Sequence, residues 1–250
     1  MHRRVAHYGA GSRRPHNAGK SIPYSLMSAS AAEPALTIDV ISDVVCPWCF
    51  VGRRRLGAAL QVLAHREPGI RPLVSWHPFQ LNPELPREGI DRRAYLEAKF
   101  GGRERAGEIY DNVRAAGQTV GLDFAFERIE RQPNTLDAHR LISWAQARGD
   151  AEDVVERLFR AYFLEGRFVG DREVLAAIAG EAGHSAEAAR AYLATDEGVD
   201  AITTMDARVR ELGVTGVPFF IFDGRVAVSG AQEASVLVDA MDEAKKAVNT

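Results

Sequence analysis

The stretch SDVVCPWCFVG, residues 42–52, joins an apolar segment to a helical one through two cysteines. The preceding segment, Leu36–Ser42, is rich in apolar and β-branched residues and predicts a buried strand. Cys46 then opens a predicted helix that runs to about Arg66. Pro47 suits the first helical position, because its φ is already helical and its missing N–H is no loss there. The sequence therefore places Cys46 at the N-cap of a helix.

This position gives the two cysteines different chemistry. Unpaired backbone N–H groups and the positive end of the helix dipole favour the thiolate form of Cys46. Cys49 lies one turn deeper, where Cβ atoms at i and i+3 are roughly 5–6 Å apart, so that a modest adjustment closes a disulfide. We therefore predict a redox pair in which Cys46 is the exposed, attacking sulfur and Cys49 resolves the mixed disulfide. Trp48 brings no positive charge, which predicts a couple less oxidising than one with histidine there.

Other interpretations of the cysteine pair are weaker. A zinc site needs two more ligands, yet the chain holds only two cysteines, and His77 and His139 form no recognisable ligand pair. We therefore expect no metal. An inert structural pair would not need the start of a helix.

Two further positions are candidates for the same site. Val217-Pro218 opens an apolar strand, where proline is awkward unless the bond is cis. A cis bond would turn the Val217 backbone toward Cys46, leaving its N–H and C=O free for an extended substrate; a trans proline starting a strand is the alternative. Asp43 precedes Cys46 by three residues and either moves protons for Cys49 or is a solvated loop acid.

Three other features have simpler interpretations. The run Arg53-Arg54-Arg55 is expected to be a solvated face, although it could raise the local potential. Asn134 is expected to cap a helix, and His139 to be a satisfied surface histidine. The alternative is that 132–135 and His139 line a cleft between helices and sheet.

The order of predicted elements gives the fold class. A second strand, Ile70–Phe79, follows the first helix, and the chain from residue 82 to 213 is helical, with its last predicted helix at Ala186–Leu212. The tail predicts a strand, an Asp223-Gly224 hairpin turn, a second strand and a C-terminal helix over Ala231–Val248. This βαβ…ββα order predicts an α/β, thioredoxin-like fold. The predicted domains are 35–81 with 214–250, and an inserted helical domain at 82–213.

Composition limits the partners. The net charge of -3 gives no reason to expect nucleic acid, and no apolar run approaches the ~18 residues of a membrane span. Cysteine poverty fits a reducing, cytoplasmic compartment. Residues 1–34 are basic and nearly free of acids; we expect a disordered or poorly ordered extension, with a transit peptide or a natural start at Met27 as alternatives.

Three motifs together resemble the DsbA-like family, and most closely its FrnE-type cytoplasmic branch. They are SDVVCPWCFVG at 42–52, QPNTLDAHR at 132–140 and GVTGVPFFIF at 213–222, within a likeness that covers about residues 36–248. The resemblance implies dithiol–disulfide oxidoreductase or isomerase activity without a bound cofactor, with Cys46 as nucleophile, Cys49 as resolving thiol and Val217-Pro218 as the cis-proline element. The expected partners are protein substrates with thiols or disulfides; glutathione and a second copy of the chain in a homodimer are further candidates, and the oligomeric state stays open.

Two other functions remain open. The same fold hosts glutathione-dependent 2-hydroxychromene-2-carboxylate isomerases and kappa-class transferases, which are similar in outline but typically carry serine where Cys46 stands. The third hypothesis is a non-enzymatic chaperone that holds unfolded chains with its helical segment.

Overall fold

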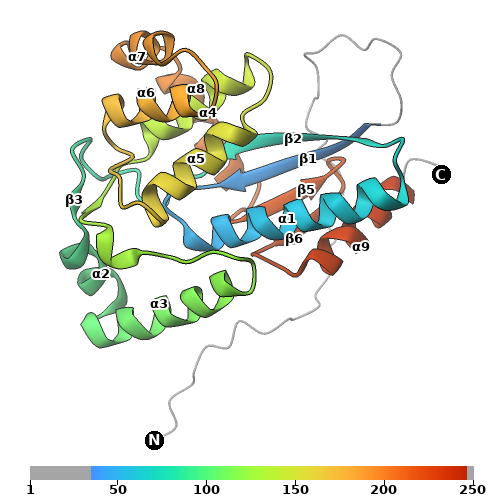
Figure 1. Cartoon of the computed structure of the whole chain (residues 1–250), viewed down its shortest axis with the longest axis horizontal. Coiled ribbons are helices and arrows are strands. Elements are labelled where there is room, and N and C mark those ends of the chain that lie inside the picture. Colours follow the sequence, from blue (N-terminus) through green and yellow to red (C-terminus); the bar gives the residue numbers. More distant parts are fainter. Residues whose placement is uncertain (1–34, 247–250) are drawn as a thin grey trace, which may run out of the picture. The chain divides into compact units, whose positions relative to one another are not determined.

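The computed structural model describes residues 35–246, which contain a four-stranded mixed sheet of order β2-β1-β5-β6 (Figure 1). The central strand β1 (Ala35–Ser42) pairs in parallel with β2 (Arg71–Pro78) and antiparallel with β5 (Phe219–Phe222). β5 in turn pairs antiparallel with β6 (Val226–Ser229). The predicted α/β, thioredoxin-like class is confirmed. The expected extension at 1–34 lies outside the described residues.

Two helices pack along the sheet. α1 (Pro47–Arg66) connects β1 to β2, and α9 (Ala234–Lys246) follows β6. They lie side by side in Figure 1 and contact each other. Both bury apolar side chains, such as Leu56 from α1 and Met241 from α9, which explains why amphipathic segments fold here. α9 begins three residues later than predicted, and its predicted end at Val248 lies outside the described residues.

The hairpin between β5 and β6 has the predicted turn. Asp223 and Gly224 adopt positive φ angles of 50° and 63°, as a tight turn between twisted strands requires. The Asp223 carboxylate also accepts hydrogen bonds from the Thr37 backbone N–H (2.8 Å) and hydroxyl (3.2 Å). One turn residue thus closes the hairpin and ties it to β1.

The segment 82–213 holds the remaining helices, as predicted; its standing as a separate domain stays a prediction. Asp171 and Ser185 cap two of these helices with their side chains, as expected. Two short strands pair in a way that the sequence did not reveal. The elements are β3 (Ile90–Asp91), α2 (Arg92–Phe100), α3 (Arg103–Gln118), the 3-10 turn η1 (Phe126–Arg128), β4 (Arg131–Gln132), α4 (Leu136–Gln146), α5 (Glu152–Phe163), α6 (Arg172–Glu181), α7 (Ala186–Ala194) and α8 (Val199–Glu211).

The prediction of one long helix over Ala186–Leu212 is wrong, because the chain breaks between α7 and α8. Buried Arg140 from α4 stabilises the chain at the break. Its guanidinium donates to the backbone carbonyls of Tyr192 (3.2 Å), Thr195 (2.8 Å) and Glu197 (2.9 Å). The backbone itself leaves the helical conformation here, since Thr195 is extended (φ -92°, ψ 178°) and Gly198 has a positive φ of 82°.

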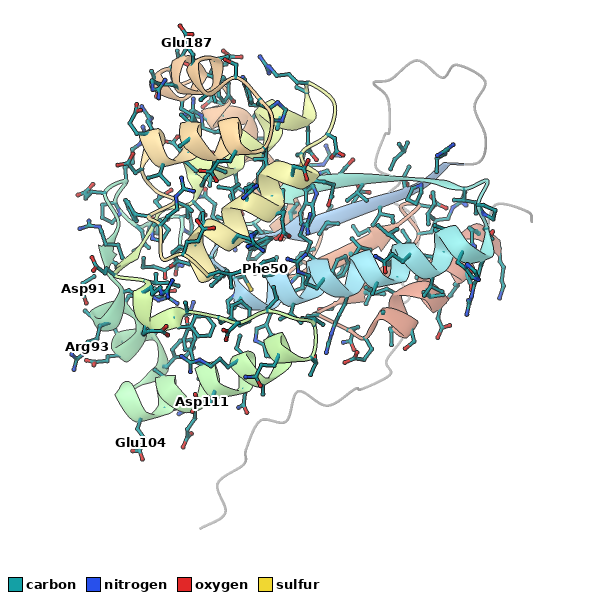
Figure 2. The ribbon with its side chains drawn as sticks, in the orientation of Figure 1. Phe50, Asp91, Arg93, Glu104, Asp111 and Glu187 are labelled. Carbon is teal, nitrogen blue, oxygen red and sulfur yellow. The ribbon has the colours of Figure 1, made fainter. Side chains whose placement is uncertain are left out.

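One continuous apolar core joins the sheet to the helical segment. Phe50, in the first turn of α1, is fully buried and stacks on Phe159 of α5 with ring centroids 5.0 Å apart. Figure 2 shows Phe50 between α1 and the helices above it. Because Phe50 follows Cys49 directly, this packing fixes the first turn of α1 against the helices.

We predict that Arg140→Met lowers the free energy of unfolding by about 3–5 kcal/mol, as measured by denaturant titration. The substitution removes a shared hydrogen-bond donor from three carbonyls around the α7–α8 break and a buried partner from Asp137, 2.6 Å away. The exposed ion pair of Arg93 with Glu97 provides the control, since Arg93→Met should cost less than about 0.5 kcal/mol. Equal, small losses in both variants would contradict the role given to Arg140.

Candidate active site

Cys46 is the N-cap of α1, and Pro47 is its first residue, as predicted. Cys46 has extended backbone angles (φ -94°, ψ 111°), and its N–H donates to the Asp43 carbonyl at 3.0 Å. The first turn of α1 contains no acidic residue. The sulfur therefore stands at the positive end of a 20-residue helix, an environment that favours an anion.

The Val217–Pro218 peptide bond is cis, as predicted. It turns the Val217 carbonyl toward Cys46, whose Sγ lies 3.5 Å from that oxygen. The expectation that this carbonyl is free is therefore wrong, because it accepts a hydrogen bond from the Cys46 thiol. Gly52 of α1 permits this approach, because a Cβ there would lie 2.8 Å from Pro218 Cγ.

Both cysteines are free and buried, so the expectation of an exposed attacking sulfur is wrong: Cys46 is 6% exposed, and Cys49, directly behind it, is 1% exposed. Burial raises the pKa of the Cys49 thiol well above its ordinary value, and the hydrogen bond and charge of Cys46 raise it further. The Ser42 hydroxyl and the Asp43 backbone N–H act in the opposite direction by hydrogen-bonding the Cys49 sulfur. Cys49 is thus held as a neutral thiol.

Asp43 is not a solvated loop acid, because its side chain is 0% exposed. One carboxylate oxygen, Oδ2, accepts from the Leu81 N–H at 2.7 Å. The other, Oδ1, has no hydrogen bond within residues 35–246 and lies 3.4 Å from Nε2 of His139. His139 is only 4% exposed, so the expectation of a surface histidine is also wrong. A buried acid–imidazole pair therefore lies beside the cysteines.

The arginine run is not a solvated face either. Arg53 pairs with Glu152 (3.2 Å) and Glu156 (2.5 Å) of α5, and Arg54 also pairs with Glu156. Arg55 donates to the Ala231 carbonyl ahead of α9. These partners lie far along the chain, so the run joins α1 to its neighbours.

Asn134 is one residue away from its predicted role, since Thr135 is the N-cap of α4. Its Oδ1 still accepts from the Leu136 N–H at 2.9 Å, while its Nδ2 donates to the carbonyls of Pro83 and Leu85. Asn134 therefore ties the loop after β2 to the start of α4.

With this geometry in view, the comparison with known proteins is decisive. Residues 37–242 match the profile of the DsbA-like thioredoxin domain. The chain belongs to the DsbA-like family. The FrnE-type branch predicted from the sequence is compatible with this match.

Individual relatives agree with the family. The DsbA-like chain is 34% identical to a probable DsbA oxidoreductase from Streptomyces coelicolor, with 84% of this chain and 90% of that one covered and a TM-score of 0.75. The uncharacterized protein YwbO of Bacillus subtilis is 26% identical over 215 residues, 84% of this chain and 98% of YwbO. The cytosolic disulfide reductase DsbM of Pseudomonas aeruginosa shares the fold, at 18% identity, 85% and 97% coverage and a TM-score of 0.55.

Two pockets lie near the start of α1 in the DsbA-like chain, and the first of them is lined by Cys46. One, of about 200 Å³, lies beside Cys46 and Trp48 and is lined by aromatic and apolar side chains of α2 and α3. The other, of about 240 Å³, lies between β2 and the helices α4, α5 and α8, and is lined by Ser42 and His139 among others. Gln132 lines the first pocket and His139 lines the second. The two residues that were expected to line one cleft therefore line two different pockets. Sequence analysis missed the α2 and α3 residues, because no motif or spacing marks them.

Within residues 35–246 no group of three or more histidine, cysteine, aspartate or glutamate side chains is arranged to hold a metal ion. Among the same residues no helix has the length and apolar character needed to cross a membrane.

We predict that iodoacetamide modifies Cys46 but not Cys49 in the reduced, native chain at neutral pH, as read by peptide mass spectrometry. The thiolate is the reactive form, and burial with a raised pKa keeps Cys49 protonated. Modification of Cys49 as fast as Cys46 would contradict the assignment.

The raised pKa of Cys49 also predicts a loss of stability at alkaline pH. Because the folded pKa lies above the unfolded value of about 8.5, the folded state favours the proton, and the free energy of unfolding falls as pH rises past that value. Denaturant titration of the Cys49→Ala variant should lack this alkaline loss.

Proposed function

We propose that this DsbA-like chain is a dithiol–disulfide oxidoreductase or isomerase that works through Cys46-Pro47-Trp48-Cys49. One observation carries the proposal: Cys46 stands at the N-terminus of α1, 3.5 Å from the Val217 carbonyl, with a buried neutral thiol directly behind it. An anion-favouring position for the attacking thiol and a second, more deeply buried thiol behind it suit two-step exchange.

The proposed reaction consists of two successive thiol–disulfide exchanges. The Cys46 thiolate attacks one sulfur of a substrate disulfide, the substrate S–S bond breaks, and the departing thiolate takes a proton from solvent. Cys49 then loses its proton and attacks Cys46 Sγ, which forms the Cys46–Cys49 disulfide and releases the second substrate thiol. The substrate is reduced by two electrons and the enzyme is oxidised; the reverse sequence oxidises a substrate dithiol.

The surroundings of Cys49 suit this order of events. Two of the causes that raise the Cys49 pKa, the hydrogen bond and the charge of Cys46, depend on Cys46 being free. Once Cys46 is tied to a substrate, these causes disappear, while Ser42 and the Asp43 N–H still favour the thiolate. We infer that Cys49 becomes easier to deprotonate at the step that needs it.

The neighbouring residues receive supporting roles in this proposal. Pro47 fixes the first turn of α1, and Trp48, which is 37% exposed, contributes apolar surface beside Cys46. Asp43, buried beside Cys49, tunes proton transfer. Val217 and Pro218 bind substrate: within residues 35–246 the Val217 N–H has no acceptor, which leaves it available to an extended peptide.

The proposed partners are proteins or small molecules with thiols or disulfides. No bound cofactor is needed for the exchange, because electrons move directly between sulfurs. Glutathione is a candidate reductant; a structure of Pseudomonas aeruginosa DsbM with glutathione has the same fold. A cytoplasmic location fits a chain whose only two cysteines form the redox pair.

We predict that the wild-type chain catalyses reduction of insulin disulfides by dithiothreitol and that Cys46→Ala abolishes this. Cys49→Ala should accumulate the mixed disulfide with substrate, visible by mass spectrometry, because the second attack is missing. Glutathione-dependent isomerase turnover without insulin reduction would support the isomerase or transferase class instead. Full suppression of aggregation by Cys46→Ala, with no exchange by the wild type, would support the chaperone.

We predict that Trp48→His makes the couple more oxidising, raising its reduction potential by about 30 mV or more in equilibrium with glutathione. A histidinium beside Cys46 would stabilise the reduced, thiolate form, which Trp48 does not. Trp48→Phe is the matched control and should change the potential much less. A Trp48→His variant no more oxidising than the parent would contradict this view of Trp48.

A further inference from the structure

Arg92, at the start of α2, is a buried cation with no carboxylate partner among residues 35–246. It is only 3% exposed. Its guanidinium donates to three neutral oxygens, those of Gln132 (2.7 Å), Tyr162 (2.6 Å) and Tyr110 (2.8 Å). Buried arginines are normally paired with acids, so this positive charge remains without local neutralisation. Two of its partners, Gln132 and Tyr110, line the pocket beside Cys46.

Tyr110 links Arg92 to the pocket, because it accepts a hydrogen bond from Arg92 and also lines the pocket. Its oxygen accepts from Arg92, but in the described part of the chain no acceptor receives its own hydroxyl proton. Burial raises the pKa of Tyr110, so the phenol keeps that proton. A hydroxyl whose oxygen accepts from a cation is a stronger donor, because hydrogen bonds polarise one another. Tyr110 therefore offers the pocket a polarised O–H.

A second cation, Lys99 of α2, lies at the same pocket. Its ammonium donates to the Tyr95 hydroxyl at 2.7 Å and lies 5.2 Å from the centre of the Tyr95 ring. No acid of residues 35–246 pairs with it, although Arg93, on the same helix, pairs with Glu97. Lys99 in the lining, and Arg92 behind Tyr110 and Gln132, give this concave site a positive potential that attracts an anion.

The rest of the pocket suits an apolar group. Its volume of about 200 Å³ is below the ~300–1,000 Å³ typical of pockets for drug-sized ligands, and so fits a side chain better than a cofactor. The lining residues that share apolar or aromatic character include Val45, Leu81, Leu96, Phe100, Ile109 and Val113.

We propose that this pocket selects disulfide substrates in which a large apolar side chain and a carboxylate lie next to the reacting sulfur. The inference rests on the proposed exchange function. The apolar side chain fills the space between α2 and α3, and the carboxylate accepts from the Tyr110 hydroxyl and the Lys99 ammonium. Oxidised glutathione has carboxylates but no large apolar group, so it fills the pocket poorly.

The test compares disulfide-linked dimers of three peptides, acetyl-Phe-Cys-Glu-amide, acetyl-Phe-Cys-Lys-amide and acetyl-Ser-Cys-Glu-amide, together with oxidised glutathione. Rates with the reduced chain are followed by tryptophan fluorescence. We expect the Phe/Glu dimer to react about fivefold faster than the Phe/Lys dimer, as partly exposed charge contacts allow, and about tenfold faster than the Ser/Glu dimer. The charge preference should shrink as salt rises.

Variants assign the preference to the pocket. Lys99→Glu should invert the preference for Phe/Glu over Phe/Lys, and Tyr110→Phe, which keeps the ring but removes the donor, should reduce it about twofold. Arg93→Glu is the matched control: Figure 2 shows Arg93 at the outer surface of α2, where the same charge change should leave the preference intact.

A second measurement separates this inference from the proposed function. In the Cys46→Ser/Cys49→Ser variant, which cannot exchange, binding of acetyl-Phe-Ser-Glu-amide should exceed that of the matching lysine peptide. Rapid exchange with every dimer and no preference would overturn the pocket inference and leave the function standing. Preferential binding of the Phe/Glu peptide, with no exchange by the wild-type chain, would support the pocket and overturn the proposed exchange function. Fastest exchange with oxidised glutathione would overturn the inference in favour of glutathione.

Discussion

The contact between Cys46 and the Val217 carbonyl depends on bringing together residues 171 positions apart. The antiparallel pairing of β1 with β5 achieves this, because Ile41 lies opposite Phe219. The end of β1 before Cys46 and the start of β5 after Pro218 therefore reach the same edge of the sheet. Gly52 then lets Pro218 approach α1 closely. A change in the register of this strand pair would separate the cysteine from the cis peptide, since one residue shifts a strand by roughly 3.3 Å.

The helical segment is attached to the same edge by partly buried polar contacts. Glu152 of α5 accepts from Arg53 of α1 and from the Trp76 indole of β2, and burial raises its pKa although both partners act against that. Asp43 holds the Leu81 N–H, at the point where the chain leaves the sheet for the helices. The loop before Cys46 therefore also positions the entry to the helical segment. This explains why an aspartate is buried where no described group gives it a full set of hydrogen bonds.

Features encoded by neighbouring residues were predictable, and those that depend on distant partners were not. Cys46 as N-cap, the Asp223-Gly224 turn and the caps Asp171 and Ser185 all follow from local backbone preferences. The arginine run was misassigned because a charge run is usually solvated, while its acidic partner Glu156 lies 103 residues away from Arg53. Asp43 and His139 show the same limit, since each is buried by elements remote in sequence. Neither periodicity nor spacing in the sequence predicted that α2 and α3 lie beside Cys46.

The two sides of the cysteine pair differ in a way that neither the sheet nor the helices could create alone. On one side, Cys46 faces a pocket whose apolar and cationic groups come from α2 and α3. On the other, the sulfur of Cys49 meets Ser42 and the Asp43 N–H from the end of β1, and Ser42 lines the second pocket together with His139 of α4. A single-sided site would expose both thiols to the same partners, and the second thiol would then react with substrate rather than with Cys46. Placing the start of α1 between the sheet and the helices keeps Cys49 neutral and buried while Cys46 lines a pocket. In the proposed exchange, the helices between β2 and β5 thus help to decide which of the two thiols reacts first.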